Sequence, residues 1–285
     1  MSRVAYVNGR FVPQRGAAVA VEDRGLQFAD GVYEVVHVAG GRFVDEERHL
    51  ARLERSLGEI RIAMPMGRAA LGLVLREVAR RNRVRDGLVY MQVTRGVARR
   101  DHAFPKPGPA TVIVTARRMG AFPRDVESWA VSAITRPDER WARCDIKSTG
   151  LLANVLAKQA AREAGAAEAI LVDAAGMVTE GASTSVWIVD REGRLRTRQL
   201  DRAILPGCTR GALIGLMAGA GIGFEEGAFS ADALRLAREV FLTSATSFVK
   251  PVTAVDGRPV GNGGVGLTTR RLFELFAQHV GAGLP

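Results

Sequence analysis

Two hairpin signals near the beginning of the chain constrain its fold more than any other sequence feature. Strand-forming residues flank Asn8-Gly9, a pair that readily adopts the positive φ angles of a type I′ turn. A second strand-forming run, at 32–38, leads into another turn pair, Gly40-Gly41. The sequence therefore predicts that this part of the chain forms antiparallel strands.

Helical periodicity follows the second hairpin. Leu50, Leu53 and Leu57 recur at spacings of three and four, which predicts a helix over 47–62. The other elements predicted for the first part of the chain are a helix over 69–82 and strands over 88–94 and 111–115. Because hairpins and helices are segregated rather than alternating as βαβ units, we expect an α+β fold and not a doubly wound sheet.

Residues 119–127, which contain Gly120 and Pro123, are the best candidate for a linker between two domains. We therefore expect a smaller N-terminal α+β domain at 1–118 and a larger C-terminal domain at 128–285. The elements predicted beyond the linker are strands over 130–134, 168–172, 185–189 and 240–243, and helices over 151–164, 209–220, 231–237 and 266–280.

The composition is that of an ordinary globular protein, because 47% of the residues are hydrophobic and 25% are charged. A formal net charge of +10 is also found in nucleic-acid-binding proteins, but the arginines are scattered among acidic residues and form no long basic run. No apolar run reaches the about 18 residues of a membrane helix, and the first residues lack a signal-peptide core. The two cysteines fit a reducing compartment, so we expect a cytoplasmic protein without nucleic-acid or membrane partners.

Several common catalytic motifs are missing from the sequence. There is no Gly-x-Ser-x-Gly segment, and the four histidines share no metal-ligand spacing. The glycine-rich stretch at 261–264 lacks the strand–turn–helix frame of a dinucleotide site. We therefore expect no serine hydrolase, no metal site and no Rossmann oxidoreductase.

Lysine is scarce in this chain, so a catalytic amine has few candidates. Only four of the 40 basic residues are lysines. Lys106 and Lys250 each lie next to a proline, where exposed turns are expected. Lys158 falls away from the apolar stripe of the helix predicted over 151–164, where we expect it to be solvated.

Lys147 differs from the other three lysines. It immediately precedes Ser148-Thr149, a plausible helix cap, so we expect it at the entrance to the following helix. An amine that is held in a cleft beside cationic groups can have a lowered pKa and act as a nucleophile or a proton carrier. A lysine with this local pattern is more often an ordinary surface residue, so the surrounding segments decide between the two interpretations.

Lys147 lies in the segment RCDIKS at 143–148, one of six segments that are informative together. The other five are DRGLQFADGVYE at 23–34, HLARL at 49–53, TEGAS at 179–183, ILPGCTR at 204–210 and LTSATS at 242–247. The six segments resemble, in the family's order along the chain, motifs of the fold type IV enzymes that use pyridoxal 5′-phosphate (PLP), and most of all those of the D-amino acid transaminases. In this resemblance RCDIKS matches the motif that carries the Schiff-base lysine. The resemblance implies a two-domain fold type IV aminotransferase whose larger, C-terminal domain binds PLP.

The resemblance also implies roles for individual residues in binding PLP. Lys147 matches the lysine that binds the cofactor covalently and then carries the α-proton of the substrate, and Glu180 matches the partner of the ring nitrogen. Leu205 matches the residue beneath the ring. The residues that match phosphate-binding positions are Arg52, Cys208, Thr209, Ser244 and Ala245.

One phosphate-binding position departs from the family pattern. Ala245 stands where the family usually has a threonine, so this position offers only a backbone N–H. The hydroxyl group of Ser244 or Thr246 could take the place of the missing one. A phosphate is otherwise expected at the start of the 209–220 helix, where free N–H groups and the helix dipole favour an anion.

The segment at 95–105, RGVARRDHAFP, resembles the loop that distinguishes D-amino acid transaminases. Arg100, His102 and Tyr33 match the residues that bind the substrate carboxylate, and a guanidinium suits such bidentate binding. Tyr90 and Ser183 match the pocket lining. In the family this loop reaches the active site of the neighbouring subunit, which implies a homodimer with shared active sites.

The activity that the resemblance implies is a ping-pong transfer of the amino group from a D-amino acid, such as D-alanine, to a 2-oxo acid, 2-oxoglutarate. A branched-chain L-amino acid transaminase and an (R)-amine-active transaminase have the same fold and remain alternatives. A basic nucleic-acid-binding protein is the alternative from a different class, and the net charge of +10 is its only support.

Overall fold

The computed structural model describes residues 3–281 of the chain. They form two compact units. The N-terminal unit comprises Met1–Ala121 and Ile146–Gly150, and the C-terminal unit comprises Phe122–Asp145 and Leu151–Pro285. The short segment Ile146–Gly150, which contains Lys147, therefore belongs to a different unit from the residues on either side of it.

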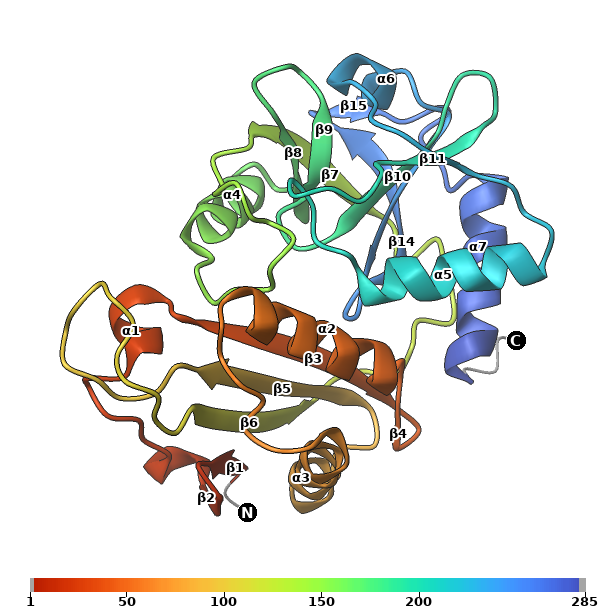
Figure 1. Cartoon of the computed structure of the whole chain (residues 1–285). Helices are drawn as coiled ribbons and strands as arrows, with labels where there is room; N and C mark the ends of the chain where they lie inside the picture. The colour runs from red at the N-terminus through yellow and green to blue at the C-terminus, as the bar shows by residue number, and fades with distance from the viewer. Residues whose placement is uncertain (1–2, 282–285) are drawn as a thin grey trace. The chain divides into compact units, whose positions relative to one another are not determined.

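A six-stranded antiparallel sheet, in the order β2-β1-β6-β5-β3-β4, forms the centre of the N-terminal unit (Figure 1). Its strands are β1 (Val4–Val7), β2 (Arg10–Pro13), β3 (Gly31–Ala39), β4 (Arg42–Phe43), β5 (Gly87–Thr94) and β6 (Thr111–Arg118). The helices of this unit are η1 (Gln14–Gly16), α1 (Arg24–Phe28), α2 (Glu46–Glu59) and α3 (Arg68–Arg81). Helix α2 packs on β3, and α3 packs on β1, β5 and β6.

Both predicted hairpins are present in this sheet. Asn8 has a φ of 46° and Gly9 a φ of 90°, as the type I′ turn between β1 and β2 requires. Gly40 and Gly41, at 57° and 86°, connect β3 to β4 in the same way. The leucines that predicted the first long helix lie on its buried side, and Leu53 and Leu57 are fully buried in the core of this unit.

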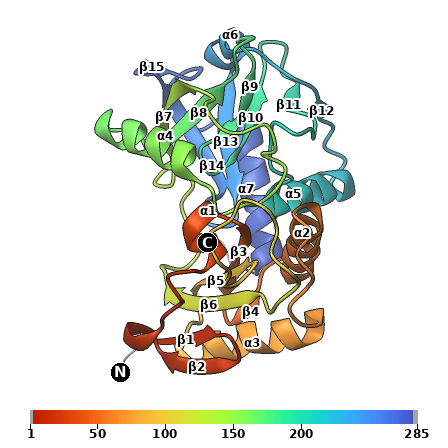
Figure 2. The same cartoon turned by 60° about the vertical axis from the view of Figure 1, so that its left-hand side comes forward.

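The C-terminal unit contains a nine-stranded mixed sheet in the order β12-β11-β10-β13-β14-β7-β8-β9, with β15 paired to β14 (Figure 2). Its strands are β7 (Val131–Pro137), β8 (Glu168–Val172), β9 (Val178–Gly181), β10 (Ser185–Val189), β11 (Leu195–Thr197), β12 (Glu225–Glu226), β13 (Glu239–Ser244), β14 (Phe248–Val255) and β15 (Arg258–Pro259). Its helices are α4 (Leu152–Glu163), α5 (Cys208–Gly219), α6 (Ala231–Arg235) and α7 (Leu267–Val280). Strand β7 runs parallel to β8 and β14, whereas β13 is antiparallel to both of its neighbours.

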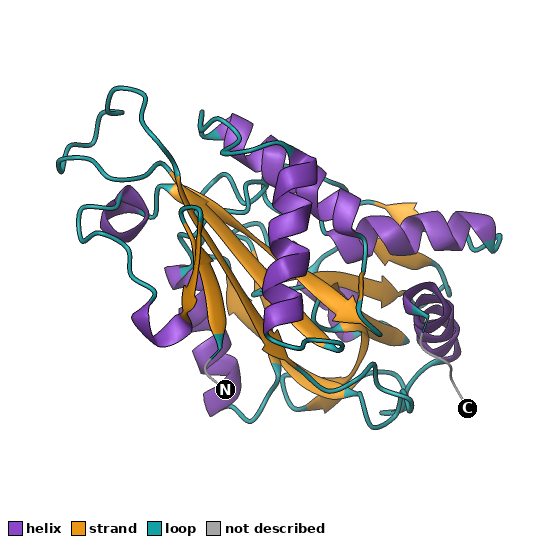
Figure 3. Cartoon of the chain, turned by 90° about the horizontal axis from the view of Figure 1, so that it is seen from below, coloured by secondary structure: helices purple, strands orange, loops and turns teal. Residues whose placement is uncertain are grey.

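Both faces of this second sheet are covered in its middle, since every residue of β10 is buried. Successive side chains of a strand point to opposite faces, so Val186 and Ile188 pack in one core cluster while Trp187 lies on the other side. There Trp187 stacks on Phe241 with ring centroids 5.6 Å apart. Helices α5 and α7 contact each other and the central strand β13. Figure 3 distinguishes the helices of the chain, in purple, from its strands, in orange. The fold is α+β with two units, as the sequence predicts.

The structure corrects the expected position of Lys147. Helix α4 begins after Leu151, and no side chain caps it. Instead of capping this helix, Ser148 pairs with Val32 of β3, and the Thr149 hydroxyl donates a hydrogen bond to the Ala29 carbonyl at 3.1 Å. The prediction of a Ser148-Thr149 helix cap is therefore wrong, because these residues extend the N-terminal sheet.

One further lysine prediction is wrong. Lys250 lies within β14, not in an exposed turn, and its ammonium group is 3.7 Å from the centroid of the Trp129 ring. Lys158 is exposed, as the sequence predicts, and its ammonium also lies 3.0 Å from the buried carboxylate of Glu168. Within residues 3–281, no helix is long and apolar enough to cross a membrane.

A pH-dependent loss of stability is expected from His37 of β3, whose exposed fraction is 3%. Burial lowers the pKa of His37 from 6.5 to about 4, although the charge of Asp86 acts in the opposite direction. Between pH 6.5 and pH 4 the unfolded chain therefore binds a proton that the folded chain does not. The free energy of unfolding should fall by up to about 3 kcal/mol as the pH falls through this window. At higher pH, His37 should not contribute to the pH dependence of stability.

Urea unfolding of the wild type and of His37→Gln across this pH window measures the effect. The variant should lose less stability on acidification than the wild type, because glutamine does not titrate. Parallel stability curves for the two proteins would contradict the prediction.

Candidate active site

Backbone hydrogen bonds hold Lys147 in place within the N-terminal unit. Its carbonyl accepts a hydrogen bond from the Tyr33 N–H at 3.0 Å. Its own N–H donates to the hydroxyl of Ser56, on α2, at 3.4 Å. The pairing of Ser148 with Val32 continues this attachment. The main chain at Lys147 is thus attached to both β3 and α2.

The Lys147 side chain lies against an aromatic pair. Its ammonium nitrogen is 4.2 Å from the centroid of the Tyr33 ring, which stacks on Tyr90 at a centroid distance of 5.7 Å. The Tyr90 hydroxyl donates to Gln92 at 2.6 Å, and burial, with the nearby Tyr33, raises the pKa of Tyr90 to about 12. Among the described residues of this unit, no group accepts a hydrogen bond from the Lys147 ammonium. The amine therefore has a fixed backbone and lies against the ring of Tyr33.

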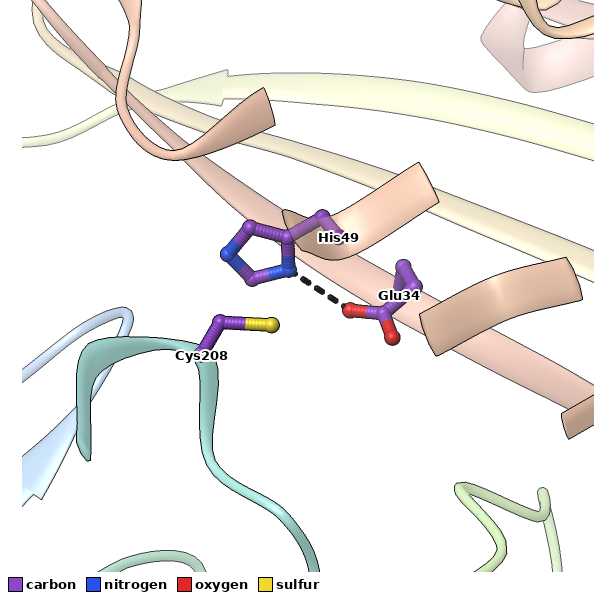
Figure 4. Close-up of side chains that lie close together, drawn as sticks. All are labelled: Glu34, His49 and Cys208. Atoms are coloured by element: carbon purple, nitrogen blue, oxygen red, sulfur yellow. Dashed lines mark hydrogen bonds and ion pairs between the residues drawn. The ribbon is translucent and has the colours of Figure 1, made fainter. Parts of the chain in front are cut away.

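Arg52, a predicted phosphate-binding residue, belongs to a buried charge cluster with Glu34 and His49. Its Nε and Nη2 donate to the two carboxylate oxygens of Glu34 at 2.7 and 2.8 Å. His49 Nδ1 lies 2.7 Å from Glu34 Oε2 (Figure 4). Burial acts to raise the pKa of Glu34, but the charge and hydrogen bonds of Arg52, with those of His49, lower it to about 2. Glu34 therefore stays ionised and fixes the plane of the Arg52 guanidinium.

The predicted carboxylate-binding residues Arg100 and His102 gather around one ring. Arg100 Cζ lies 4.7 Å from the centroid of Phe28, and the His102 ring lies 5.3 Å from the same centroid. Both side chains are exposed. In the described part of this unit no hydrogen bond or ring contact joins them to Tyr33, which instead lies with Tyr90 and Lys147.

In the C-terminal unit, Glu180 is a buried carboxylate with its oxygens held in place. It forms an ion pair with Arg140, and its Oε2 accepts a hydrogen bond from the Leu205 N–H at 3.1 Å. Arg140 is fixed in turn by Asp138, 2.7 Å away, and by the Ala203 carbonyl at 2.9 Å. The sequence interpretation assigned no role to Arg140, which has no neighbouring motif that would have marked it.

The bond from Leu205 connects Glu180 to the beginning of α5. Gly207 caps this helix without a side-chain hydrogen bond, and the first helical bond runs from the Gly211 N–H to the Gly207 carbonyl at 2.9 Å. The N–H groups of Cys208 and Thr209 therefore have no partner within the helix. Free N–H groups and the positive end of the helix dipole make this terminus suitable for an anion.

A tight turn between β13 and β14 lies next to the same helix terminus. Ser244 accepts hydrogen bonds from the N–H groups of Thr246 and Ser247 at 3.3 and 3.0 Å, so its hydroxyl group stabilises the turn. A Cβ atom at Gly207 would lie 2.9 Å from the hydroxyl of Ser185, a neighbour of this turn because it pairs with Thr243. The structure thus brings Glu180, Leu205, the start of α5 and the turn containing Ser244 and Ala245 together within one unit.

Ser183, expected to line the pocket, forms part of a separate polar cluster. Its hydroxyl group donates to Glu168 Oε2 at 2.9 Å, and Thr184 donates to the same oxygen at 3.1 Å. Lys158 and the Ala169 N–H hold the other oxygen, each at 3.0 Å. Glu168 is 2% exposed and fixes the loop that follows Glu180. Sequence reasoning missed Glu168, because a single glutamate in a strand has no motif to mark it.

The Glu34 cluster generates a stability prediction. Glu34→Gln would leave the buried guanidinium of Arg52 without its counter-charge, which should lower the free energy of unfolding by about 3–5 kcal/mol. Glu47→Gln, on the helix that carries Arg52, is the matched control, because the pair of Glu47 with Arg68 is exposed and its loss should change the free energy of unfolding little. Equilibrium unfolding in urea measures both. Equal losses for the two variants would contradict the assignment.

Comparisons with known proteins identify the family of this chain. The family described as amino-transferase class IV matches residues 31–255. A D-alanine aminotransferase of Bacillus licheniformis is 42% identical over 266 residues, which cover 93% of this chain and 93% of that protein. A D-alanine aminotransferase of Listeria innocua is 40% identical, over 96% of this chain and 95% of that protein.

Solved structures of aminotransferases also resemble this chain. A branched-chain amino acid aminotransferase from Escherichia coli matches with a TM-score of 0.88 and 26% identity, over 99% of this chain and 96% of that one. The family match spans most of the chain, and the two D-alanine aminotransferases are at least 40% identical to it. This chain is a member of the class IV aminotransferase family.

Proposed function

We propose that this protein is a PLP-dependent D-amino acid transaminase. It would move the amino group of a D-amino acid, such as D-alanine, to a 2-oxo acid, such as 2-oxoglutarate, in two successive half-reactions. The observation that carries this proposal is the similarity over nearly the whole chain to two D-alanine aminotransferases, at 42% and 40% identity. The loop that contains Arg100 and His102 supports the same substrate class.

The side chains and helix termini described above fit PLP, which has a phosphate, a ring nitrogen and an aldehyde. The phosphate matches the start of α5, where no side chain caps the helix and Gly207 leaves no room for a Cβ beside Ser185. The buried carboxylate of Glu180 would pair with the ring nitrogen, and the amine of Lys147 would bind the aldehyde. Arg52, Cys208 and Thr209 would bind the phosphate, Leu205 would pack beneath the ring, and the turn at Ser244 and Ala245 would add N–H groups.

PLP supplies an electron sink that stabilises negative charge at the substrate Cα. The task of Lys147 is to move a proton with its Nζ, and its anchored backbone leaves only the side chain free to do so. Glu180 keeps its orientation through Arg140 and Leu205, so it can hold a proton on the ring nitrogen. Glu34 holds the guanidinium of Arg52 in a single plane, and a guanidinium with a fixed plane suits recognition of a phosphate.

Carboxylate binding sets the stereochemistry. Arg100 offers a bidentate guanidinium, and His102 and Tyr33 offer further donors. The position of the bound carboxylate decides which Cα–H faces Lys147. Tyr90 and Ser183 are proposed to line the pocket around the substrate side chain. The similarity to a branched-chain amino acid aminotransferase at a TM-score of 0.88 makes an L-specific enzyme of this fold the second candidate.

We also propose a homodimer with shared active sites. Helix α4 supports it, because Leu152, Val155 and Leu156 are 73%, 58% and 59% exposed, an unusual amount of apolar surface for one helix. The boundary between domains is proposed within 119–127, and the C-terminal domain is proposed to bind PLP. A cytoplasmic location is proposed because both cysteines are free thiols.

The substrate proposal is tested by one half-reaction in the absence of an acceptor. Mixing the yellow holoenzyme with D-alanine should change the absorbance spectrum of the bound cofactor, and mixing it with L-leucine should leave the spectrum unchanged. A carboxylate-free (R)-amine should react more slowly than D-alanine, because it cannot use Arg100. Preferential conversion by L-leucine would establish the second candidate instead.

Lys147→Ala is the control for this experiment. The variant should lose turnover by at least about a hundredfold, the usual contribution of one positioned acid–base group. Mass spectrometry of the borohydride-treated wild type should find the cofactor attached to the peptide that contains Lys147. Full activity in Lys147→Ala would refute the role of this lysine.

The dimer proposal predicts the oligomeric state of two variants. Val155→Glu places a charge in the exposed apolar face of α4 and should shift the protein from dimer to monomer in sedimentation velocity experiments. Leu267→Glu is the matched control, because it places the same charge at an exposed leucine of another helix, α7, and it should leave the dimer intact. A monomeric wild type at micromolar concentration would contradict the proposal.

A further inference from the structure

Arg24, the first residue of α1, is a buried cation to which the proposed function assigns no role. Its exposed fraction is 3%, which is rare for an arginine. Its Nε lies 2.7 Å from Asp30 Oδ2, so its charge is balanced by a carboxylate. The rest of its guanidinium points toward the loop that contains Arg100 and His102.

Arg24 holds the backbone on both sides of His102. Its Nη1 donates hydrogen bonds to the carbonyl of Asp101 at 2.5 Å and to the carbonyl of Ala103 at 3.3 Å. These carbonyls belong to the residues immediately before and after His102. Two acceptors on one guanidinium nitrogen fix the position from which the His102 side chain projects.

Asp30 connects this contact to the beginning of the loop. It accepts hydrogen bonds from Arg95 Nε at 2.7 Å and from Arg95 Nη2 at 3.0 Å, as well as from Arg24. Burial acts to raise the pKa of Asp30, but Arg95 and Arg24 lower it below its usual value. The N–H of Arg24 also donates to the Gly96 carbonyl at 2.9 Å. One carboxylate thus holds the two arginines that fasten the start and the middle of the loop.

Phe28, at the other end of α1, supports three side chains at once. Arg24 Cζ lies 4.8 Å from the ring centroid and Arg100 Cζ lies 4.7 Å from it. The His102 ring lies 5.3 Å away at an interplanar angle of 47°. Cation–π attraction of this kind favours a fixed position for each guanidinium. Arg100 and His102 are exposed and would otherwise be free to move with their loop.

We infer that Arg24 is a positioning residue that sets the carboxylate-binding loop before substrate arrives. Through the carbonyls of Asp101 and Ala103, and through Phe28, it holds Arg100 and His102 in one arrangement. Holding a loop in its binding conformation removes the entropy cost of ordering it during binding. The inference rests on the proposed function, because it assigns this loop to the substrate carboxylate.

An arginine suits this task better than a lysine. A guanidinium is planar and presents five N–H donors in a fixed fork, so it can reach Asp30 and the two loop carbonyls together. A lysine keeps the charge but offers one nitrogen on a flexible stem. Arg24→Lys therefore separates the hydrogen-bond geometry from the charge.

The test uses PLP-loaded Arg24→Lys and Arg24→Gln proteins. Hydrogen exchange followed by mass spectrometry should show faster exchange in the 97–105 segment of both variants than in the wild type. The KM for D-alanine should rise about tenfold, the effect of losing one or two hydrogen bonds, while kcat stays within about twofold. Cofactor absorbance should be unchanged, because Arg24 acts on substrate binding.

Arg99→Gln is the matched control, since Arg99 is an exposed arginine of the same loop. It should leave both the exchange rate and KM at wild-type values. Unchanged exchange in the 97–105 segment of Arg24→Lys, or a fall in kcat without a rise in KM, would overturn the inference. If Arg24→Gln fails to fold, Phe28→Leu replaces it, and this variant should also raise KM.

The two proposals fail in different ways. If the wild type does not react with D-alanine, the proposed function is wrong, whatever the variants do. If the wild type reacts with D-alanine but the loop of Arg24→Lys exchanges at the wild-type rate, only the role of Arg24 is wrong.

Discussion

The pairing of a short segment with the edge of β3 is the interaction on which the candidate active site depends. Ser148 pairs with Val32, and the Tyr33 N–H bonds to the Lys147 carbonyl at 3.0 Å. These bonds assign Ile146–Gly150 to the N-terminal unit, while the residues on either side belong to the C-terminal unit. The chain therefore delivers its one candidate catalytic amine to Tyr33 and Tyr90 at a fixed backbone position.

Arg52, Glu180 and Arg24, three of the residues with a proposed role, are each held by a carboxylate–arginine contact that is largely buried. Glu34 fixes Arg52, Arg140 fixes Glu180, and Asp30 fixes Arg24 and Arg95. Removing one partner of such a contact leaves an uncompensated charge away from water, so these contacts are strongly constrained once formed. Some of the chain's arginines thus lie inside the fold, where they orient functional groups.

Local sequence predicted the elements that depend on local geometry. Asn8-Gly9 predicted a hairpin because only a few residues accept positive φ, and the leucine spacing around Leu53 predicted α2 because a helix face repeats every three to four residues. The pairing of Ser148 with β3 was not predictable, since its partner lies more than a hundred residues earlier. Glu168 and Arg140 were missed because a single charged residue has no motif to mark it. Glu34 belongs to the 23–34 segment, but the sequence did not show that it pairs with Arg52. The roles of the predicted site residues and the linker at 119–127 stay predictions.

The unequal use of arginine and lysine has a physical explanation. Arg24, Arg52 and Arg140 each bind two or more acceptors in a fixed plane, which the compact ammonium group of lysine cannot do. Fixed cations in this fold are therefore arginines. A proton carrier has the opposite requirement, because it must lose its proton and move, and a guanidinium does neither. Lys158 is paired with Glu168, and Lys250 lies on Trp129. Lys147 combines an anchored backbone with an amine that can release and take up a proton, and both properties suit proton transfer.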